Sequence, residues 1–470
     1  MRKTKIICTI GPASENKETL IAMCKAGMNV ARLNFSHGTY PEQQSKIDLI
    51  KQVRQELGLP IAIMLDTKGP EYRIRTFESG RITLNEGDDF IFTTDEVEGD
   101  QHRVSVNYKH LTENLKPGDR ILVNNGLVVF EVTGIRGSDV QTRVIVGGEL
   151  SNRKSMSFPN KVMSGPYLSE QDRQDLLFGI QNEVDFVAAS FVSTKGDMEE
   201  LKAFLAANGG GNIDLIAKIE NRAGVDNIES ICEVADGVMI ARGDLGVEIP
   251  FVEVPAIQKR LTSTCRMLGK RVITATEMLE SMIHNPRPTR AEISDVANAV
   301  YDGNSAVMLS GESAAGKYPV EAVKTMADIC EFTEQHTSYN TRFYKADFRI
   351  RNTLDAVSHA VCAMAIDVEA KGIVVCSVSG TTARMVSRFR CPVDIIGMTT
   401  DERIFRRLAL SWGVTPVLAE EFNSQDVMFF HAMASARKVL HLQKGDRVVL
   451  TGGPINGKTG NTNTIKVETV

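Results

Sequence analysis

Short apolar runs that end in polar residues recur along most of the chain. Eight are present: KIICTIGP (5–12), MNVARLNFS (28–36), IAIMLDTKGPE (61–71), VDFVAASF (184–191), IDLIAKIE (213–220), GVMIARGD (237–244), RVITATEM (271–278) and SAVMLSGE (305–312). Continuous apolar runs are typical of strands buried on both faces. Most are separated by helical segments such as 14–25, where Ser14 is a plausible N-cap and Gly27 a helix stop. Eight strand–helix units predict a (β/α)8 TIM barrel with its chemistry at the C-terminal strand ends.

Two segments break this period and predict further domains. The first, 70–166, changes to short alternating strands with turns such as KPGD and NNG, which indicates an all-β lid inserted after the third strand. From residue 346 a new α/β pattern begins, with GIVVCSVSG, VDIIGMTT and DRVVLTGG as strands. We therefore expect a catalytic barrel at 1–69 and 167–345 with a linker over 336–345, a lid at 70–166, and a C-terminal α/β regulatory domain at 346–470. The two barrel segments together are close in length to the about 250 residues that this fold needs.

Composition and charge narrow the class of protein. Hydrophobic residues make up 42% of the 470 residues and charged residues 24%, as in ordinary soluble globular proteins. The formal net charge of −5 argues against nucleic-acid binding, and no run approaches the ~20 apolar residues of a membrane span. The eight cysteines show no CxxC spacing, and the first apolar run is too short for a signal peptide. We expect a soluble cytoplasmic protein without nucleic-acid or membrane partners.

The stretch Ile213–Pro250 concentrates the candidate chemistry. Its two apolar runs end in charge, and helical spacing over roughly 227–234 between them predicts a β-α-β unit. Lys218 and Glu220 point to the same side of one strand, and Asp244 ends the next run. A lysine and two carboxylates at neighbouring strand ends suit a divalent metal and an anionic substrate. Each carboxylate alone is more often a helix cap or a salt-bridge partner.

Other polar residues at strand ends allow several roles. Lys218 could place positive charge on a phosphoryl group in transfer, form a Schiff base, or neutralise nearby acids. Thr276, at the seventh strand end, could bind substrate, and Ser310 with Glu312 at the eighth could join a proton relay. Ser and Thr at such positions also commonly cap the next helix.

The second and third runs predict a cluster of oxygen donors. Arg32, Asn34 and Ser36 alternate onto one face, and the third run ends in Asp66 and Thr67. Arg32 offers a planar fork for a phosphate or carboxylate. The other four residues supply oxygens with one carboxylate among them, so a monovalent cation is plausible. A hydrogen-bonded barrel rim explains the same spacing equally well.

Two glycine-rich loops follow strands near the C-terminus. SVSGTTAR (377–384) opens a helix and could supply hydroxyls and backbone N–H groups to a phosphate. GGPINGKTGNTN (452–463) is the second. Neither is a GxxxxGKS or GxGxxG element, which argues against nucleotide hydrolysis there. Two flexible turns are the alternative reading.

Six motifs in order resemble pyruvate kinase over the whole chain, at the length of bacterial forms: MNVARLNFSHG, LDTKGPE, IDLIAKIENRAGV, ARGDLGVEIP, NPRPTRAE and VMLSGESAAGKYP. The resemblance implies a lidded barrel with a regulatory C-terminal domain, assembled as a homotetramer. It implies transfer of the phosphoryl group of phosphoenolpyruvate to ADP, giving pyruvate and ATP in the last step of glycolysis. Mg2+ (or Mn2+) and K+ would be the cofactors.

The resemblance also implies roles for individual residues. Glu220 and Asp244 would hold Mg2+, Lys218 would stabilise the transferring phosphoryl group, and Arg32 would bind its oxygens. The substrate carboxylate would meet Thr276 and the backbone of Gly243 and Asp244, and K+ would meet Asn34, Ser36, Asp66 and Thr67. The nucleotide would contact Asn34, Phe35, Ser36, His37, Arg73 and Lys154, and a phosphorylated effector Ser377, Ser379, Gly380, Thr381 and Thr382. Glu71, where K+-independent members carry lysine, implies that K+ is required.

Several positions depart from the family pattern. Asn124 and Asn125 replace two aspartates in the lid, and KSMSFPN (154–160) differs from a KGVNLPG-like strand, which bears on lid closure and nucleotide affinity. The effector loop lacks the lysine of some fructose-bisphosphate-activated members, for which Arg384 could compensate, so effector identity stays open. Further departures are Ala223, Glu277 and Ser305.

Two other functions use parts of this pattern. A Mg2+-dependent pyruvate-enolate aldolase on a similar barrel would not need the lid or the K+ residues. A sugar-phosphate sensor with a decayed site would not need Lys218, Glu220, Asp244 and Thr276 together. We therefore expect a pyruvate kinase.

Overall fold

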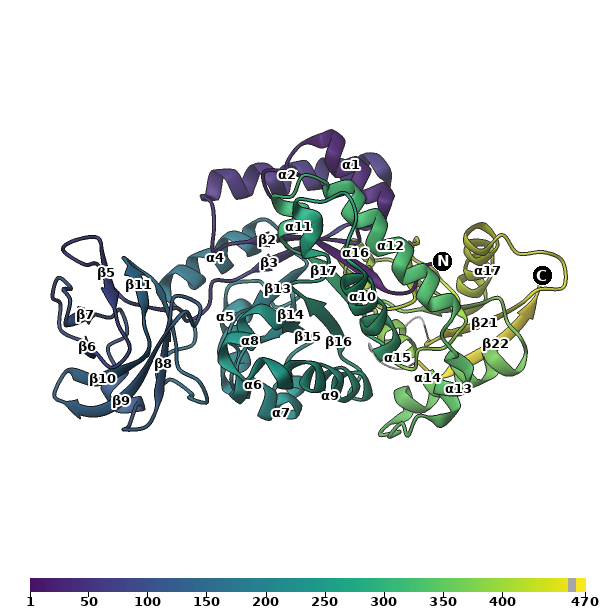
Figure 1. The fold of residues 1–470 in the computed structure, drawn as a ribbon. Helices are drawn as coiled ribbons and strands as arrows, with labels where there is room; N and C mark the ends of the chain where they lie inside the picture. The colour runs from purple at the N-terminus through teal and green to yellow at the C-terminus, as the bar shows by residue number, and fades with distance from the viewer. Residues whose placement is uncertain (455–461) are drawn as a thin grey trace.

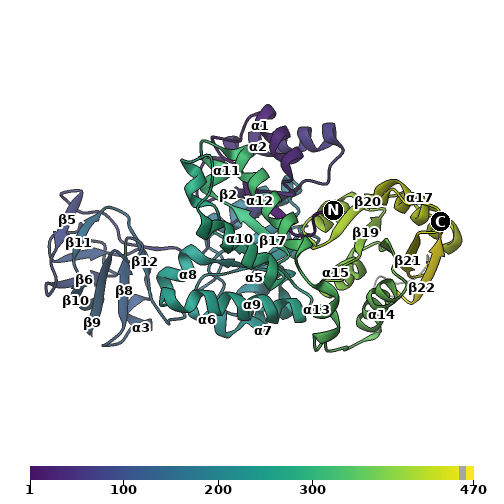
Figure 2. The same cartoon turned by 45° about the vertical axis from the view of Figure 1, so that its right-hand side comes forward.

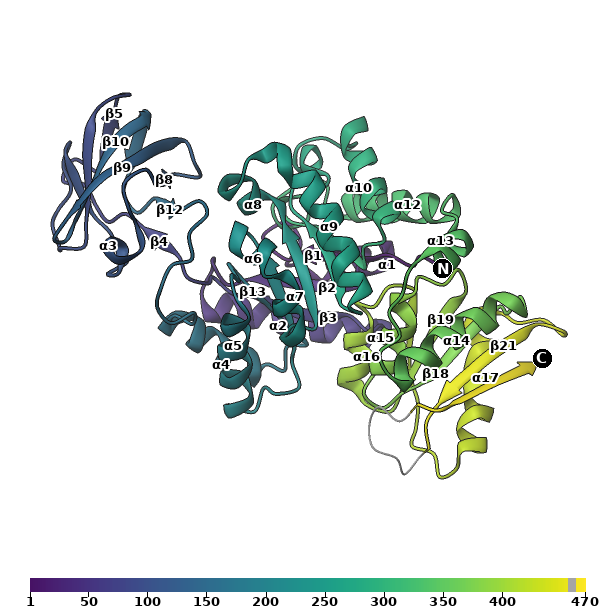
Figure 3. The ribbon, with the colours of Figure 1, turned by 90° about the horizontal axis from the view of Figure 1, so that it is seen from below.

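The computed structural model describes residues 1–454 and 462–470. They form three bodies in a row, with a β lid at one end, a closed barrel in the middle, and an α/β domain that carries the C-terminus at the other end (Figures 1 and 2). The view from below (Figure 3) shows the same order. Within the described ranges, no helix is long and apolar enough to cross a membrane.

The eight apolar runs form a closed parallel barrel, as predicted. Its strands are β1 (Lys5–Thr9), β2 (Val30–Asn34), β3 (Ala62–Asp66), β13 (Phe186–Ala189), β14 (Asp214–Ile219), β15 (Gly237–Ala241), β16 (Arg271–Ala275) and β17 (Ala306–Leu309). They neighbour one another in chain order, and β1 pairs with β17 to close the ring. Side chains such as Met64, Phe186 and Met239 fill the interior, so the barrel is a packed core rather than a pore. The (β/α)8 prediction is confirmed.

Helices cover the outside of the barrel and bury a second apolar layer against the strands. They are α1 (Lys17–Ala26), α2 (Tyr40–Leu57), α4 (Glu170–Gln181), α5 (Lys195–Ala207), α6 (Arg222–Asp226), α7 (Ile228–Val234), α8 (Arg242–Glu248), α9 (Val254–Met267), α10 (Arg290–Asp302), α11 (Gly311–Ala314) and α12 (Pro319–Gln335), with single turns η1 (Phe251–Glu253) and η2 (Glu280–Ile283). Capping boxes begin α2, α4, α5 and α10, where a Ser or Thr N-cap and an acidic residue three positions later exchange hydrogen bonds.

The N-cap predicted at Ser14 is wrong. Helix α1 begins at Lys17, because Asn16 accepts the Thr19 amide at 2.9 Å and caps the first turn. Ser14 is buried, and its hydroxyl instead accepts the Gly11 amide at 3.2 Å. The predicted stop is present, since Gly27 ends the helix at φ 123°.

The β-α-β unit around Lys218 differs from its prediction in two details. The helix expected over roughly 227–234 is α7, but α6 precedes it, capped by Asn221, which accepts the Gly224 amide at 2.8 Å. Asp244 was expected at a strand end and lies instead in α8, because β15 stops at Ala241 and the chain turns directly into a helix.

The lid is a β structure with one helical turn, α3 (Leu111–Asn114). Its strands are β4 (Tyr72–Arg73), β5 (Arg81–Leu84), β6 (Asp89–Thr93), β7 (Arg103–Ser105), β8 (Arg120–Val123), β9 (Val128–Arg136), β10 (Asp139–Val146), β11 (Gly148–Ser151) and β12 (Ser155–Ser157). They form a seven-stranded sheet and a two-stranded sheet. Alternate residues of β5 and β10 face a core around Phe90, Phe92 and Phe130, which explains the alternating sequence.

The C-terminal domain is a five-stranded sheet in the order β20-β19-β18-β21-β22. The strands are β18 (Gly372–Cys376), β19 (Asp394–Thr399), β20 (Val414–Leu418), β21 (Arg447–Gly452) and β22 (Thr464–Thr469), and the helices are α13 (Tyr339–Lys345), α14 (Thr353–Asp367), α15 (Thr381–Arg388), α16 (Glu402–Leu408) and α17 (Gln425–Leu440). The segment expected as a linker over 336–345 is therefore partly helical. Its Tyr339 is buried and packs on Trp412 with ring centroids 5.3 Å apart, which docks the segment.

Buried ion pairs join the barrel to the C-terminal domain. Asp214, at the start of β14, lies 2.7 Å from Arg271 and 2.6 Å from Arg407 of α16. Arg384 of α15 lies 3.7 Å from the same carboxylate. Ser305 also contributes, because its hydroxyl accepts the Arg390 guanidinium at 3.0 Å. This contact gives the departure at Ser305 a structural role.

We predict that Asp214→Asn loosens this junction. The change leaves Arg271, which is 5% exposed, and Arg407 without their shared counter-charge, so the free energy of unfolding should fall by about 3 kcal/mol. Trp412 is the single tryptophan and is buried at the junction, so its fluorescence during urea unfolding reports the change. The exposed Asp328→Asn of α12 is the matched control and should shift stability by less than about 0.5 kcal/mol. Equal midpoints for both variants would contradict the assignment.

Candidate active site

A cavity of about 390 Å3 opens between the lid and the C-terminal ends of the barrel strands. The predicted residues that line it are Arg32, Asn34, Ser36, His37, Asp66, Arg73, Lys218, Glu220 and Asp244. Lid residues Tyr72, Asn125 and Ser155 line it from the other side. Outside its lining, and all within the described ranges, are the predicted residues Phe35, Thr67, Lys154, Gly243, Thr276, Ser310 and Glu312, together with the five predicted effector residues in 377–382.

The floor of this cavity is a buried cluster of charges. Arg32 Nε lies 2.6 Å from one oxygen of Asp66, and Lys218 Nζ lies 3.0 Å from the other. Lys218 also lies 3.0 Å from Glu220 and donates a 2.6 Å hydrogen bond to Ser190. Two cations and two carboxylates are thus held together at the ends of β2, β3 and β14.

Burial and mutual attraction shift the ionisation of this cluster. Burial opposes the charge on Asp66, but Arg32 and Lys218 outweigh it and hold the pKa of that carboxyl below its ordinary value. Burial also opposes the charge on Lys218, yet Asp66 and Glu220 raise the lysine pKa to about 12. The lysine is therefore positively charged at neutral pH.

Glu220 is less well compensated than Asp66. One oxygen accepts the Phe191 amide at 2.6 Å, while the other is buried and has only the Lys218 ammonium, 3.0 Å away, as its neighbour of opposite charge. Burial, reinforced by the negative charge of Asp244 and relieved in part by Lys218, raises the Glu220 pKa to about 7. Asp244 lines the same cavity. This donor set fits a divalent cation, which would supply the missing positive charge.

The remaining ligands of such a cation would not be acidic side chains. No group of three His, Cys, Asp or Glu side chains suited to a metal occurs in residues 1–454 and 462–470. Two carboxylates with substrate oxygens and water form a usual Mg2+ arrangement.

The oxygens expected around a monovalent cation lie partly together. Asn34, Ser36 and Asp66 line the cavity. The Asn34 side-chain oxygen accepts a hydrogen bond from the Ser36 amide at 3.1 Å, which is the contact expected if these residues form a hydrogen-bonded rim of the barrel. Thr67 is buried behind them, where its hydroxyl accepts the Ser190 amide at 3.2 Å. A K+ site at these four residues stays a prediction.

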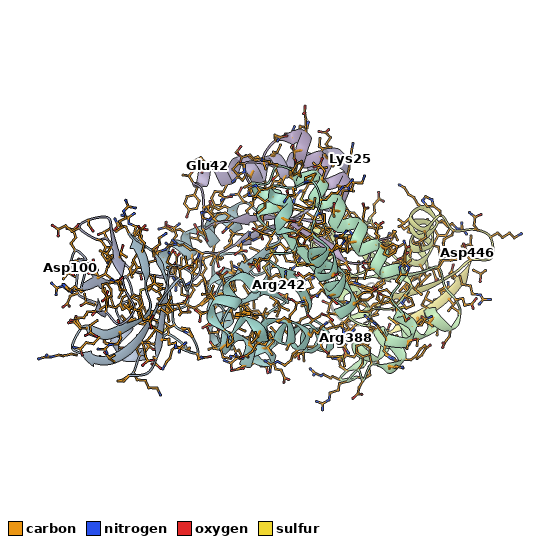
Figure 4. The ribbon with its side chains drawn as sticks, in the orientation of Figure 1. Lys25, Glu42, Asp100, Arg242, Arg388 and Asp446 are labelled. Atoms are coloured by element: carbon orange, nitrogen blue, oxygen red, sulfur yellow. The ribbon has the colours of Figure 1, made fainter. Side chains whose placement is uncertain are left out.

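Thr276 and Gly243 meet through a strained turn beside the cavity. Thr276 Oγ1 accepts the Gly243 amide at 2.8 Å. Thr276 and Glu277 both have left-handed backbones, at φ 67° and 54°, which are uncommon for residues with a Cβ. Arg242 fixes the turn, because its guanidinium donates to the Thr276 carbonyl at 2.6 Å and pairs with Asp295 at 2.6 Å. Figure 4 labels Arg242 in the central body.

Ser310 and Glu312 are arranged as a helix start. Glu312 is buried, and its carboxylate accepts the amides of Ser310 at 2.7 Å and Leu279 at 3.0 Å. Within the described part of the chain, the Ser310 hydroxyl itself makes no capping hydrogen bond, so the alternative of a serine cap is not confirmed. The proton relay stays a prediction.

The nucleotide residues are divided between the cavity and its surroundings. His37 and Arg73 line it, whereas Phe35 packs on Phe178 with ring centroids 5.8 Å apart. Glu71 also lines the cavity and forms ion pairs with Arg73 and, at 2.9 Å, with Lys68.

The two asparagines that depart from the family pattern in the lid suit the backbone conformation at their positions. Asn124 and Asn125 occupy a tight turn at φ 58° and 56°, where asparagine is well tolerated. Ser155 of β12 lies 3.2 Å from the Asn125 side chain and supports the turn. Of the other two, Ala223 lies within α6, and Glu277 is exposed and outside the cavity lining.

The predicted effector loop lies at the end of β18. Gly380 has φ 72° and precedes α15, and the Ser379 hydroxyl donates to Thr381 at 3.0 Å. Thr382 is buried, 2.6 Å from the Thr462 hydroxyl. Arg384 pairs with Asp236 at 3.1 Å, so the idea that it compensates for the missing effector lysine loses support. Most of the second glycine-rich loop, 455–461, lies outside the described residues.

Sequence reasoning missed three residues that the geometry brings forward. Ser190 ends the fourth apolar run, and that position was its only signal. Arg242 stood in a quoted motif but shows its role only through the turn that it contacts. Glu248 lines the cavity from α8, and burial, opposed by a hydrogen bond from Ser157 of the lid, raises its pKa to about 7.

Comparisons with known proteins agree with this geometry. The family model for the pyruvate kinase barrel domain matches residues 1–323, and that for the pyruvate kinase alpha/beta domain matches 355–468. A pyruvate kinase of Clostridium acetobutylicum is 45% identical over 472 residues, covering 100% of both chains. One of Geobacillus stearothermophilus is 47% identical over 100% of this chain and 80% of its own.

A solved structure supports the same assignment. The crystal structure of a pyruvate kinase from Cryptosporidium parvum superposes with a TM-score of 0.94 at 35% identity, covering 100% of this chain and 96% of that one. These likenesses extend over the lid and both other bodies, and they do not favour an aldolase or a decayed sensor. The chain belongs to the pyruvate kinase family of phosphotransferases.

Proposed function

We propose that the cavity beneath the lid is where this enzyme transfers the phosphoryl group of phosphoenolpyruvate to ADP. The observation that carries the proposal is the buried cluster of Arg32, Asp66, Lys218 and Glu220 on the cavity floor. A β-phosphate oxygen of ADP attacks phosphorus, and the bond from phosphorus to the enol oxygen breaks. The electron pair leaves with the enolate, and protonation of its carbon gives pyruvate.

Lys218 and Arg32 would act as preorganised positive charges on the phosphoryl oxygens. Both are already oriented by Asp66, so little reorganisation is needed when charge develops. Thr276 and the backbone of Gly243 and Asp244 would hold the substrate carboxylate next to this centre. The lid residues that line the cavity would exclude water, which favours transfer to ADP over hydrolysis.

The cations would bind on either side of this cluster. Glu220 and Asp244 would hold Mg2+ (or Mn2+), which when bound supplies positive charge to substrate oxygens. Asn34, Ser36, Asp66 and Thr67 would hold K+. The nucleotide would contact the 34–37 segment, Arg73 and Lys154.

Assembly, regulation and location extend the proposal. The domain division at 1–69 with 167–345, 70–166 and 346–470 is supported by separate apolar clusters in the barrel, the lid and the C-terminal domain, except that Phe343 of α13 packs in the C-terminal one. Exposed apolar side chains such as Phe251 and Phe430 offer surface for a homotetramer. The loop Ser377–Thr382 would receive a phosphorylated effector. Eight free, buried cysteines support a reducing, cytoplasmic location.

We expect the purified protein to form pyruvate from phosphoenolpyruvate only when ADP, Mg2+ and K+ are all present. Oxidation of NADH by added lactate dehydrogenase measures the product. Omission of ADP is the control, because hydrolysis alone would also release pyruvate. Product formation at the same rate without ADP, or none with the full mixture, would overturn the proposed reaction.

Lys218→Met should lower kcat by about 10²–10³-fold, because it removes a positive charge aimed at the transferring group while keeping a similar side-chain volume. Steady-state kinetics in the coupled assay measures the loss. Lys202→Met, an exposed lysine of α5, is the matched control and should leave kcat unchanged. If the two variants have the same kcat, the role of Lys218 is wrong.

K+ should support a severalfold higher rate than Na+ at equal ionic strength. Glu71→Lys should reduce this difference, because the new ammonium group would lie among the cavity-lining residues Asn34, Ser36 and Asp66. Glu71→Gln removes the carboxylate without adding an ammonium group and should keep the preference for K+. Equal rates of the unmodified enzyme in both salts would remove the monovalent site.

A further inference from the structure

A second cavity, of about 190 Å3, lies between the barrel and the C-terminal domain. Its barrel wall is formed by the turns that lead into β13 and β14, and its other wall is α16. The polar side chains that line it are Glu183, Asp185, Asn212, Arg403, Arg406 and Arg407. This cavity is at the N-terminal ends of the barrel strands, opposite the cavity under the lid.

Arg406 is paired with a barrel carboxylate at this cavity. Its Nε donates to Asp185 at 2.8 Å, and Arg54 lies 3.8 Å from the same carboxylate. Asp185 therefore has two cationic neighbours and contributes little free negative charge. Glu183 is exposed, so solvent screens its charge.

The other two arginines keep unused hydrogen-bonding capacity. Arg407 donates through Nη1 to Asp214 and to the Asn212 carbonyl, both at 2.6 Å, whereas its Nη2 has no acceptor among the described residues. Arg403 is exposed, and its side chain has no partner in the described part of the chain.

The nearby carboxylate cannot neutralise these groups. Asp214 is shared among Arg271, Arg384 and Arg407, and its pKa is low because these three arginines outweigh its burial. The charge around the inner wall of the cavity is therefore positive. Planar guanidinium groups with free N–H donors match the oxygens of phosphate, which accept paired hydrogen bonds.

We propose that this interdomain cavity binds a small phosphate-type oxyanion, held by Arg403 and Arg407 of α16 on one wall and by Asn212 of the barrel on the other. Its volume admits a compact phosphate or a small phosphate monoester. None of its lining residues belongs to the cavity under the lid or to the loop Ser377–Thr382. The site is therefore distinct from both.

Its position gives the bound anion a mechanical role. The strands β13 and β14 begin beside this cavity and end at Ser190 and Lys218 on the floor of the other one. An anion held by Arg403 and Arg407 that also contacts Asn212 would link α16 to the turns that start these strands. We expect it to tighten the joint.

Hydrogen exchange followed by mass spectrometry tests the site without using activity. The full chain is titrated with inorganic phosphate, in the absence of substrates, against chloride and acetate at matched ionic strength. We expect phosphate alone to slow exchange in peptides covering 208–214 and 402–408. Arg403→Gln should weaken this apparent affinity by about tenfold, the effect of one lost charge-assisted contact.

Two further variants make the result decisive. Arg437→Gln removes an exposed arginine from α17 of the same domain and should bind as the unmodified chain does. Arg407→Lys keeps the positive charge next to Asp214 but removes the planar guanidinium group. It should also weaken the protection from hydrogen exchange that phosphate gives. No protection, equal protection by chloride or acetate, or unchanged affinity in Arg403→Gln would overturn the proposal. Protection confined to the 377–382 loop or to the cavity under the lid would overturn it as well.

Discussion

The shared carboxylate of Asp66 is the constraint on which the active face depends. It lies between Arg32 and Lys218, and all three side chains are nearly excluded from water. Buried charges are costly unless they are paired with good geometry, so the three strands that carry them must keep a fixed spacing. The closed barrel provides this spacing, because β2 and β3 pair directly and β13 alone separates β3 from β14. Ser190, at the end of β13, fills the remaining gap with a hydrogen bond to Lys218.

The two ends of the barrel use charge for different purposes. The cavity at the C-terminal strand ends is lined by Lys218, Glu220 and Asp244, whose charges are not fully balanced by their protein neighbours. Unbalanced charges of this kind suit a site that binds anions and cations. At the N-terminal ends, Asp185 and Asp214 meet arginines of the next domain in closed pairs. Chemistry at one face and stability at the other is the usual division of labour in this fold. The cavity beside Arg403 and Arg407 is where the second face departs from it.

Periodicity was sufficient to predict the barrel, since each strand is buried on both faces and its apolar run is unbroken. It also placed Lys218 and Glu220 correctly, because side chains two apart in a strand share a side. It could not place Asp244, since nothing in the local sequence distinguishes a strand end from a helix that starts at once. The hydrogen bond from Arg242 to Thr276 and the one from the Leu279 amide to Glu312 join residues more than thirty positions apart, which local spacing does not encode. The docking of α13 on Trp412 was missed for the same reason.

The left-handed turn at Thr276 and Glu277 has a consequence for how the site responds to small movements of α8. Arg242, which clamps the turn, and Asp244, which faces the cavity, belong to the same first turn of α8. A displacement of that helix therefore moves the threonine and the carboxylate together. The hydrogen bonds from Arg242 and Gly243 thus tie the position of Thr276 to that of Asp244. The lid residues that line the cavity therefore face an aspartate whose position is coupled to that of Thr276.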